Sequence, residues 1–225
     1  MKLFLSLSGV AMIVILGAFM SIQKKQRVIF FGDSITQAGV QPGGYITRIG
    51  QLATQAGSAA AFDFVGAGIG GNKIYDLYLR ADDDVLAKSP DVVVIYVGVN
   101  DVWHKRSSGT GTDADKFVRF YEALIKKLQV KGAKIVLCTP AVIGERTDSS
   151  NEQDGDLNLY SQMIRDLASR NSLPLVDLRK AFLEYNKQNN TGNKESGILT
   201  TDRVHLNDKG NQLVADEMWK VLKGI

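Results

Sequence analysis

The chain has 225 residues, of which 44% are hydrophobic and 23% charged, with only 4 prolines. This composition excludes a largely disordered chain and predicts one globular domain with a sizeable core. The net charge is +3, with acidic and basic residues mixed along the chain, which argues against a nucleic-acid partner and favours a small ligand. Cys138 is the only cysteine, so no disulfide can form within the chain, and we expect its thiol to pack in the core.

The N-terminus differs in kind from the rest of the chain. The stretch LFLSLSGVAMIVILGAF, directly after Lys2, is almost wholly apolar, and the polar SIQKKQR follows soon after it. This layout predicts a signal peptide or an N-terminal membrane anchor over residues 1–25, ahead of a folded domain over residues 26–225. The basic residues after the apolar stretch outnumber those before it, which opposes simple export, and a small-residue cleavage site is poorly marked. We nevertheless expect export, as a periplasmic, secreted or membrane-anchored protein, with residues 3–22 as the means of any membrane attachment.

Five short runs further along the chain are near-continuously apolar and rich in Val, Ile and Phe, as strands buried on both faces of a parallel sheet are. These runs are RVIFFG (27–32), FDFVGAG (62–68), DVVVIYVG (91–98), KIVLCTP (134–140) and LPLVDL (173–178). Stretches with helical periodicity alternate with them, at residues 43–56, 72–88, 113–131, 156–171 and 207–223. The alternation predicts an α/β fold, a doubly wound three-layer α/β/α sandwich around a five-stranded parallel sheet.

Polar residues with catalytic potential gather where the predicted strands end. Gly32-Asp33-Ser34 follows the first strand, Gly68-Ile69-Gly70-Gly71-Asn72 the second and Gly98-Val99-Asn100-Asp101 the third, while Asp202-Arg203-Val204-His205 precedes the last helix. In this architecture ligands bind beyond the carboxyl ends of the strands. Hydrolysis of an ester needs a nucleophile, a base, a group that orients the base, and donors for the oxyanion. Ser34, His205 and Asp202 have the chemistry for the first three roles. The N–H groups of Ser34 and Gly71 and the Asn100 amide suit the last.

Each of these residues also has a purely structural interpretation. A serine at a strand-to-helix turn is often an N-cap, an asparagine can form an Asx turn, and glycines serve tight turns. Asp33 is better suited to capping backbone N–H groups than to catalysis. The Asp-x-x-His spacing of Asp202 and His205 lets the carboxylate reach the ring and fix its tautomer. The combination of residues, more than any single one, predicts a catalytic site.

The four segments resemble, in order and roughly in spacing, the four sequence blocks of the SGNH hydrolases, also called GDSL esterases or lipases. The resemblance extends from about residue 27 to residue 223. It implies a flavodoxin-like three-layer sandwich and a serine ester hydrolase, with Ser34 as the nucleophile, His205 as the base and Asp202 as the partner of that base. The α/β-hydrolase elbow G-x-S-x-G does not fit, because no glycine stands two positions after Ser34.

The resemblance also implies an oxyanion hole made by Ser34, Gly71 and Asn100. Two departures from the family pattern bear on the site. The first block has Ile35 in place of leucine, a mild apolar change. The glycine block has Gly70 where many relatives carry another small residue, so Gly70 stands as the alternative donor to Gly71.

The most specific prediction from the sequence concerns the substrate. Trp103 and His104 come just after the third block, and we expect them to line the substrate pocket. A tryptophan there can stack on a sugar ring or simply cover the core. The loops HKRSSGTGTDAD, IGERTDSSNEQDGD and NKQNNTGNKESG are polar, whereas a long acyl chain needs an apolar channel. We therefore expect hydrolysis of short acyl esters, foremost the O-acetyl groups of carbohydrates, without a cofactor or metal. The alternative within the family is a lysophospholipase, general lipase or thioesterase.

Two functions of other classes compete with this interpretation. A metal-dependent phosphoesterase gathers several histidines and carboxylates around two metal ions, and this chain has only two histidines. A non-catalytic carbohydrate-binding protein would be marked by the loss of a catalytic residue, and here all of them are present.

Overall fold

The computed structural model describes residues 24–225, and residues 1–23 of the predicted signal peptide or anchor lie outside this range. Its centre is a sheet with the strand order β2-β1-β3-β4-β5, in which all neighbours are parallel. The strands are β1 (Gln26–Gly32), β2 (Phe62–Gly68), β3 (Val92–Tyr96), β4 (Lys134–Cys138) and β5 (Leu175–Val176). This is the flavodoxin-like strand order, so the predicted fold class is confirmed.

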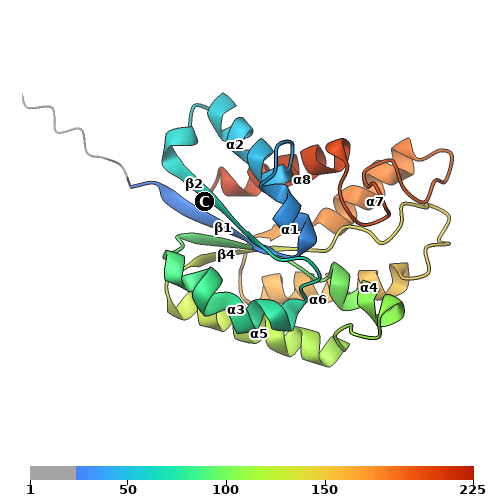
Figure 1. The fold of residues 1–225 in the computed structure, drawn as a ribbon, viewed down its shortest axis with the longest axis horizontal. Helices are drawn as coiled ribbons and strands as arrows, with labels where there is room; N and C mark the ends of the chain where they lie inside the picture. The colour runs from blue at the N-terminus through green and yellow to red at the C-terminus, as the bar shows by residue number, and fades with distance from the viewer. Residues whose placement is uncertain (1–23) are drawn as a thin grey trace, which may run out of the picture.

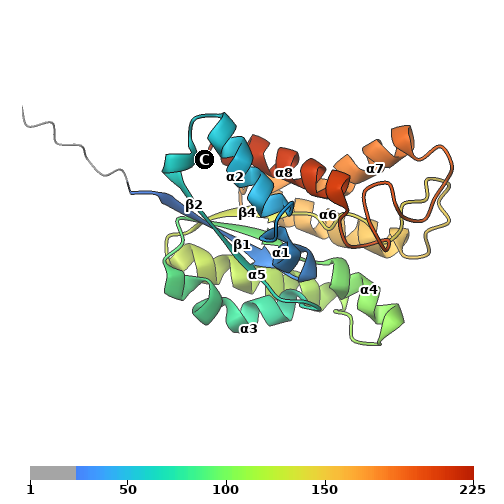
Figure 2. The same ribbon diagram turned by 45° about the horizontal axis from the view of Figure 1, so that its top comes forward.

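Helices cover both faces of the sheet and complete the three layers (Figures 1 and 2). One face carries α1 (Ser34–Gly39), α2 (Tyr45–Gln55), α7 (Leu178–Asn189) and α8 (Asp208–Leu222). The other carries α3 (Ile74–Asp84), α4 (Val99–Ser107), α5 (Ala114–Val130) and α6 (Asp154–Arg170). Short 3₁₀ turns occupy Ala59–Ala61 and Leu86–Lys88. Within residues 24–225, no helix combines the length and apolarity needed to cross a membrane.

Burial explains why the strands and the long helices were predictable. Every residue of β3 is buried, as a central strand with helices on both faces requires. The helix α5 buries residues at helical spacing, namely Phe117, Tyr121, Leu124, Ile125 and Leu128. The structure adds three helices that the sequence did not predict, α1, α4 and α7. The first two are short and begin inside the polar motif segments. The buried face of α7 includes the polar Arg179 and Asn186, which weakens its apolar periodicity.

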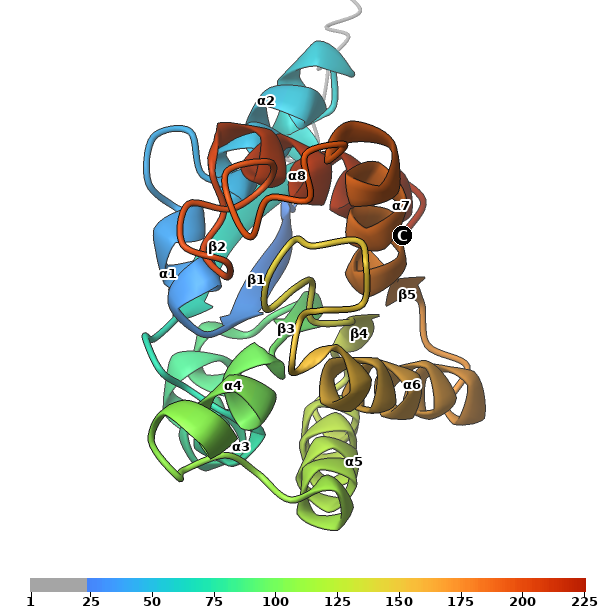
Figure 3. The same cartoon turned by 90° about the vertical axis from the view of Figure 1, so that its right-hand side faces the viewer.

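The order of strands reverses between β1 and β3, which creates a crevice at their carboxyl ends. Figure 3 looks toward this end of the sheet, with α1 and α4 on opposite sides of the strands. Ser34 directly follows β1, and Asn100 lies in the first turn of α4, just after β3. The topology therefore brings these two segments to the same crevice.

Candidate active site

The serine stands where β1 passes directly into α1. A Cβ at Gly32 would lie 2.3 Å from the carbonyl oxygen of Tyr96, so only glycine allows β1 to approach β3 this closely before the turn. The N-cap of α1 is Asp33, whose carboxylate accepts a hydrogen bond of 3.0 Å from the N–H of Ile35. Asp33 thus takes the capping role, and the interpretation of Ser34 as the cap is wrong. The hydroxyl of Ser34 is directed to another partner.

That partner is the histidine of the last motif. Ser34 Oγ lies 2.9 Å from His205 Nε2, and His205 Nδ1 lies 2.7 Å from Asp202 Oδ2. The other oxygen of Asp202 accepts hydrogen bonds from the N–H groups of His205 (2.8 Å) and Val204 (3.1 Å). Burial raises the pKa of Asp202, but the hydrogen bonds from His205 and Val204 outweigh it and hold this pKa below its ordinary value. The ionised carboxylate orients the ring so that Nε2 faces the hydroxyl.

The spacing of Asp202 and His205 is not unique in the sequence, because Asp101 also stands three residues before His104. Spacing alone therefore does not identify His205, and the structure separates the two pairs. Asp101 Oδ1 accepts from the N–H of Ile74 at 3.2 Å and is not bonded to the ring of His104. Of the two pairs, only Asp202 and His205 are joined by a hydrogen bond between carboxylate and imidazole.

The glycine segment and Asn100 offer three potential oxyanion donors. The N–H of Gly70 is already bonded to Gln37 Oε1 at 2.8 Å, whereas the N–H of Gly71 has no acceptor within residues 24–225. The amide nitrogen of Asn100 donates to the carbonyl of Asn72 at 3.1 Å, which uses one of its two hydrogens. This geometry favours Gly71 over Gly70 as an oxyanion donor.

Arg80 on α3 is a residue of this region that the sequence analysis missed. Its Nη2 donates to the carbonyls of Gly32 (2.8 Å) and Ala67 (3.0 Å), and its Nε donates to Asn72 Oδ1 at 2.6 Å. The guanidinium thus links the ends of β1 and β2 to the glycine segment. A lone arginine in an amphipathic helix gives no sequence signal for such a link.

Two buried carboxyl groups lie behind the crevice. Burial raises the pKa of Asp33 to about 7 and that of Asp101 to about 6. Asp33 is 2% exposed and Asp101 is fully buried. They hold the N-termini of helices α1 and α3 through the N–H groups of Ile35 and Ile74, so their part here is structural.

On α4, Trp103 lies next to His205, and His104 lies next to Trp103. The ring centroid of Trp103 is 6.3 Å from that of His205 and 5.6 Å from that of His104. Burial, followed by the charge of Lys73, lowers the pKa of His104 below its ordinary value. Both rings are partly exposed, which leaves them accessible from the crevice.

The polar loop at residues 143–156, which the sequence analysis used as an argument about the substrate, is partly buried. Glu145, Asn151 and Gln153 are buried, with exposed fractions of 1%, 7% and 7%. Some polar side chains of this loop therefore form hydrogen bonds inside the protein. The polar composition of the loop is for this reason weaker evidence about the substrate than the sequence suggested.

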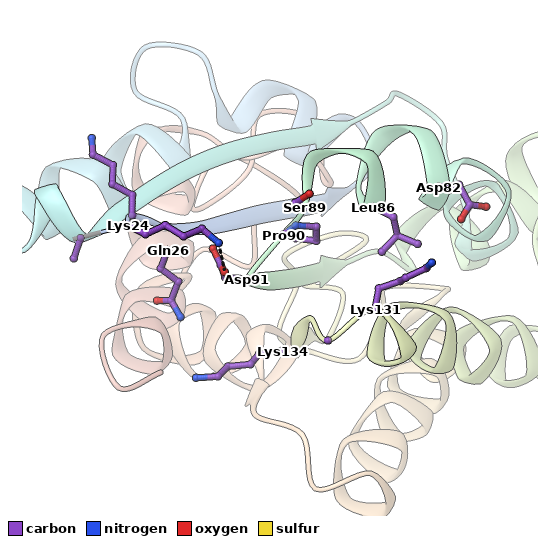
Figure 4. Close-up of a pocket in the computed structure, with 12 residues that line it drawn as sticks. Lys24, Gln26, Asp82, Leu86, Ser89, Pro90, Asp91, Lys131 and Lys134 are labelled. Carbon is purple, nitrogen blue, oxygen red and sulfur yellow. Dashed lines mark hydrogen bonds and ion pairs between the residues drawn. The ribbon is translucent and has the colours of Figure 1, made fainter. Parts of the chain in front are cut away.

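No cluster of three or more metal-ligating side chains occurs within residues 24–225. A cavity of about 1000 Å³ lies at the other end of the sheet, near the start of β1 (Figure 4). Lysines and aspartates line it, among them Lys24, Asp91, Lys131 and Lys134, and none of the residues at the crevice takes part.

A serine, a histidine and an aspartate hydrogen-bonded in series, at the switch point of a flavodoxin-like sheet, are typical of the class of serine hydrolases. Residues 30–213 match the GDSL-like Lipase/Acylhydrolase family, and the chain belongs to it. The protein is accordingly an enzyme that hydrolyses ester bonds. The resemblance to SGNH (GDSL) hydrolases seen in the sequence is confirmed.

Individual relatives span most of the chain. The crystal structure of an acetyl xylan esterase, AlAXEase, is 64% identical with a TM-score of 0.85, and the match covers 87% of this chain and 99% of that one. An acetylxylan esterase of Geobacillus stearothermophilus is 30% identical over 216 residues, which cover 87% of this chain and 93% of the relative. The uncharacterized lipoprotein YqeF of Bacillus subtilis (strain 168) is 27% identical over 170 residues, covering 68% and 70% of the two chains.

Proposed function

We propose that the protein is a carbohydrate O-acetylesterase that uses Ser34 as nucleophile, His205 as general base and Asp202 as the residue that orients the base. The observation that carries this proposal is the continuous hydrogen-bonded series from Ser34 Oγ through His205 to Asp202, with contacts of 2.9 Å and 2.7 Å. Both contacts are within the range that proton transfer requires.

In the first half of the proposed reaction, Ser34 Oγ forms a bond to the acetyl carbonyl carbon while its proton passes to His205 Nε2. The oxyanion that develops accepts hydrogen bonds from the N–H groups of Ser34 and Gly71 and from the Asn100 amide. Collapse of this intermediate breaks the bond between the acyl carbon and the sugar oxygen, and His205 gives its proton to that oxygen. Asp202 stabilises the transient imidazolium.

In the second half, a water molecule attacks the acetyl-serine and gives one proton to His205 Nε2. The same oxyanion donors act again, and collapse breaks the bond to Ser34 Oγ, which recovers its proton from His205. The products are the free sugar hydroxyl and acetate. This chemistry is complete with side chains and backbone groups of the chain itself.

The choice of substrate rests on two supports. Two of the relatives, one of them 64% identical over nearly its whole length, are acetyl xylan esterases. Trp103 offers a partly exposed aromatic face next to His205, and aromatic rings commonly pack against sugar rings. A sugar bearing a small acyl group satisfies both.

A substrate panel tests this proposal. We expect acetate release from acetylated xylooligosaccharides, and hydrolysis of 4-nitrophenyl esters that falls as the acyl chain lengthens beyond acetyl. Ser34→Ala, measured beside the wild type, controls for contaminating esterases. A preference for chains of about eight carbons or more, without acetate release from any glycan, would favour the lipase or lysophospholipase alternative, because each buried methylene of a fitting acyl chain contributes about 0.8 kcal/mol.

We further propose that the enzyme is exported, with residues 1–25 as a signal peptide or membrane anchor. The apolar N-terminal sequence supports this, as does the similarity to a Bacillus subtilis lipoprotein. The chain enters the fold at the start of β1, the end opposite the crevice (Figure 1), so attachment there would leave the crevice facing away from the membrane. Intact mass of the protein recovered from native cells, together with cell fractionation, distinguishes cleavage from anchoring and both from cytoplasmic retention.

A further inference from the structure

Glu145 is a buried carboxylate close to the proposed catalytic residues but outside their hydrogen-bonded series. It is 1% exposed, and no lysine, arginine or histidine within residues 24–225 forms an ion pair with it. A buried charge without an ion pair is costly unless hydrogen bonds compensate for the lost hydration. The partners of Glu145 therefore indicate what the charge does.

Those partners are three consecutive backbone N–H groups. Glu145 Oε1 accepts from Leu199 (2.6 Å) and Thr200 (2.8 Å), and Oε2 accepts from Ile198 (2.8 Å). Leu199 and Thr200 are themselves fully buried. One side chain thus fixes the backbone of residues 198–200, directly before the segment that carries Asp202 and His205.

The segment held by Glu145 is in turn bonded to the backbone around His205. The N–H of Thr201 donates to the carbonyl of His205 at 2.8 Å, and the N–H of Asn207 donates to the carbonyl of Leu199 at 2.9 Å. Thr200 and Leu206 form an isolated antiparallel bridge. A displacement of residues 198–200 would therefore move the backbone on both sides of His205.

A second contact comes from the neighbour of Glu145. The N–H of Gly144 donates at 2.9 Å to the carbonyl of Arg203, which lies between Asp202 and His205 and has a left-handed φ of 85°. Such a conformation is strained for a side chain like arginine and persists only where the surroundings hold it. Gly144 has a φ of 97°, and a Cβ there would lie 2.4 Å from Asn151 Oδ1, so glycine is required for this contact.

From these contacts we infer that Glu145 is a positioning residue for catalysis, which acts by holding the backbone of residues 198–205 so that His205 meets Ser34. The inference rests on the proposed function of Ser34 and His205. The hydrogen bonds of the Glu145 carboxylate go to residues 198–200 and to neither Ser34 nor His205, so in this arrangement it acts only through the loop. Catalytic geometry tolerates little displacement, since an error of about 1 Å can reduce the rate about a hundredfold.

The decisive variant is Glu145→Gln, which keeps the shape but places an NH₂ group opposite one of the three N–H donors. We expect kcat for an acetyl ester to fall by about tenfold or more while KM stays within about twofold, because the loop carries the base. Glu145→Asp keeps the charge with a shorter reach, and we expect partial recovery of kcat relative to Glu145→Gln. The rate at which a fluorophosphonate labels Ser34 should fall in proportion to kcat, since labelling needs the same activated hydroxyl.

Asp177→Asn is the matched control. Asp177 is another partly buried carboxylate, bonded to Arg165 and capping α7, but it has no contact with residues 198–205. Its replacement should lower the melting temperature and leave kcat unchanged at temperatures where the protein is folded. If Glu145→Gln is folded by circular dichroism and retains wild-type kcat and labelling rate, the inference is wrong. Hydrogen exchange offers a second measurement, in which unchanged protection of residues 198–200 would also contradict it.

The test of the positioning role of Glu145 can be distinguished from the test of the proposed function. Full activity of Ser34→Ala would overturn the proposed nucleophile, whatever Glu145 does. An inactive Ser34→Ala together with a fully active Glu145→Gln would overturn only the positioning role.

Discussion

Ser34 Oγ and His205 Nε2 lie 2.9 Å apart, although 171 positions separate the two residues in the chain. The fold closes this distance by placing the end of β1 and the segment before α8 at the same crevice, where the strand order reverses. The contact is a hydrogen bond between a hydroxyl and the ring nitrogen left free by the bond of Asp202 to Nδ1. Its chemical consequences can be tested residue by residue.

The first prediction concerns the nucleophile. Ser34→Ala removes the only protein atom proposed to form a bond with the acyl group, so turnover of an activated acetyl ester should fall by roughly a million-fold, with the fold intact. Steady-state kinetics and circular dichroism measure the two quantities. Ser58→Ala, at the far end of the sheet before β2, is the control and should behave as the wild type. A Ser34→Ala variant with a tenth of the activity would show that another group attacks the ester.

The second prediction concerns the base and the effect of pH. Activity should rise with pH in one step, because a protonated imidazole cannot accept the proton of Ser34. Asp202 adds no second step near neutrality, since its pKa is held below the ordinary carboxylate value. We expect His205→Ala to be about as damaging as Ser34→Ala, and a chelator to have no effect.

His104→Gln is the matched control for the base, and it should keep both the step in the pH profile and most of the activity. Burial and Lys73 lower the pKa of His104, and its ring is not hydrogen-bonded to Asp101, the carboxylate three residues before it. If His104→Gln abolishes the step, or if chelation strongly reduces activity, the assignment of the base is wrong.

The third prediction concerns the oxyanion donors. Asn100→Ala removes one proposed oxyanion donor and should reduce kcat by about a hundred- to a thousandfold with little change in KM. Gln37→Ala frees the N–H of Gly70 from its present acceptor but leaves Gly71 unchanged, so its effect on kcat should be small. Unchanged kcat in Asn100→Ala would show that its amide is not an oxyanion donor, and a large loss in Gln37→Ala would show that the bond from Gly70 to Gln37 positions this segment for catalysis.

The sequence predicted the strands and the long helices because their residues bury apolar side chains at a regular period. It placed Ser34, Asn100 and His205 at one edge because parallel strands bring their carboxyl ends together. The short helices α1 and α4 were missed because polar motif residues occupy their first turns, where packing gives no periodic signal.

Residues that act through long-range hydrogen bonds could not be predicted from the sequence. Glu145 stands in a polar stretch without periodicity, and its carboxylate is buried against N–H groups more than 50 positions away. Arg80 likewise has partners in β1 and β2 that no periodicity reveals. The Asp-x-x-His spacing occurs twice, and only three-dimensional structure shows which pair is hydrogen-bonded.

The last prediction concerns the dependence of stability on pH, and it follows from Asp33. Burial raises the pKa of this carboxyl from its ordinary value of 3.8 to about 7. Between these values the folded state holds a proton that the unfolded state has lost, so the free energy of unfolding falls as pH rises from about 4 to about 7. Above that range Asp33 adds no further change.

Asp33→Asn removes this dependence, because an amide does not titrate, while its side-chain oxygen can still accept from the N–H of Ile35. Any loss of stability caused by the altered N-cap should be the same at every pH. We therefore expect the stability of the variant relative to the wild type to improve between about pH 5 and about pH 8, as measured by urea unfolding at both values. Asp113→Asn, at an exposed aspartate whose pKa is already lowered by Lys116, should show no such change over this range. Parallel behaviour of the wild type and Asp33→Asn at the two pH values would mean that Asp33 is ionised in the folded protein throughout, and that burial alone does not govern its charge.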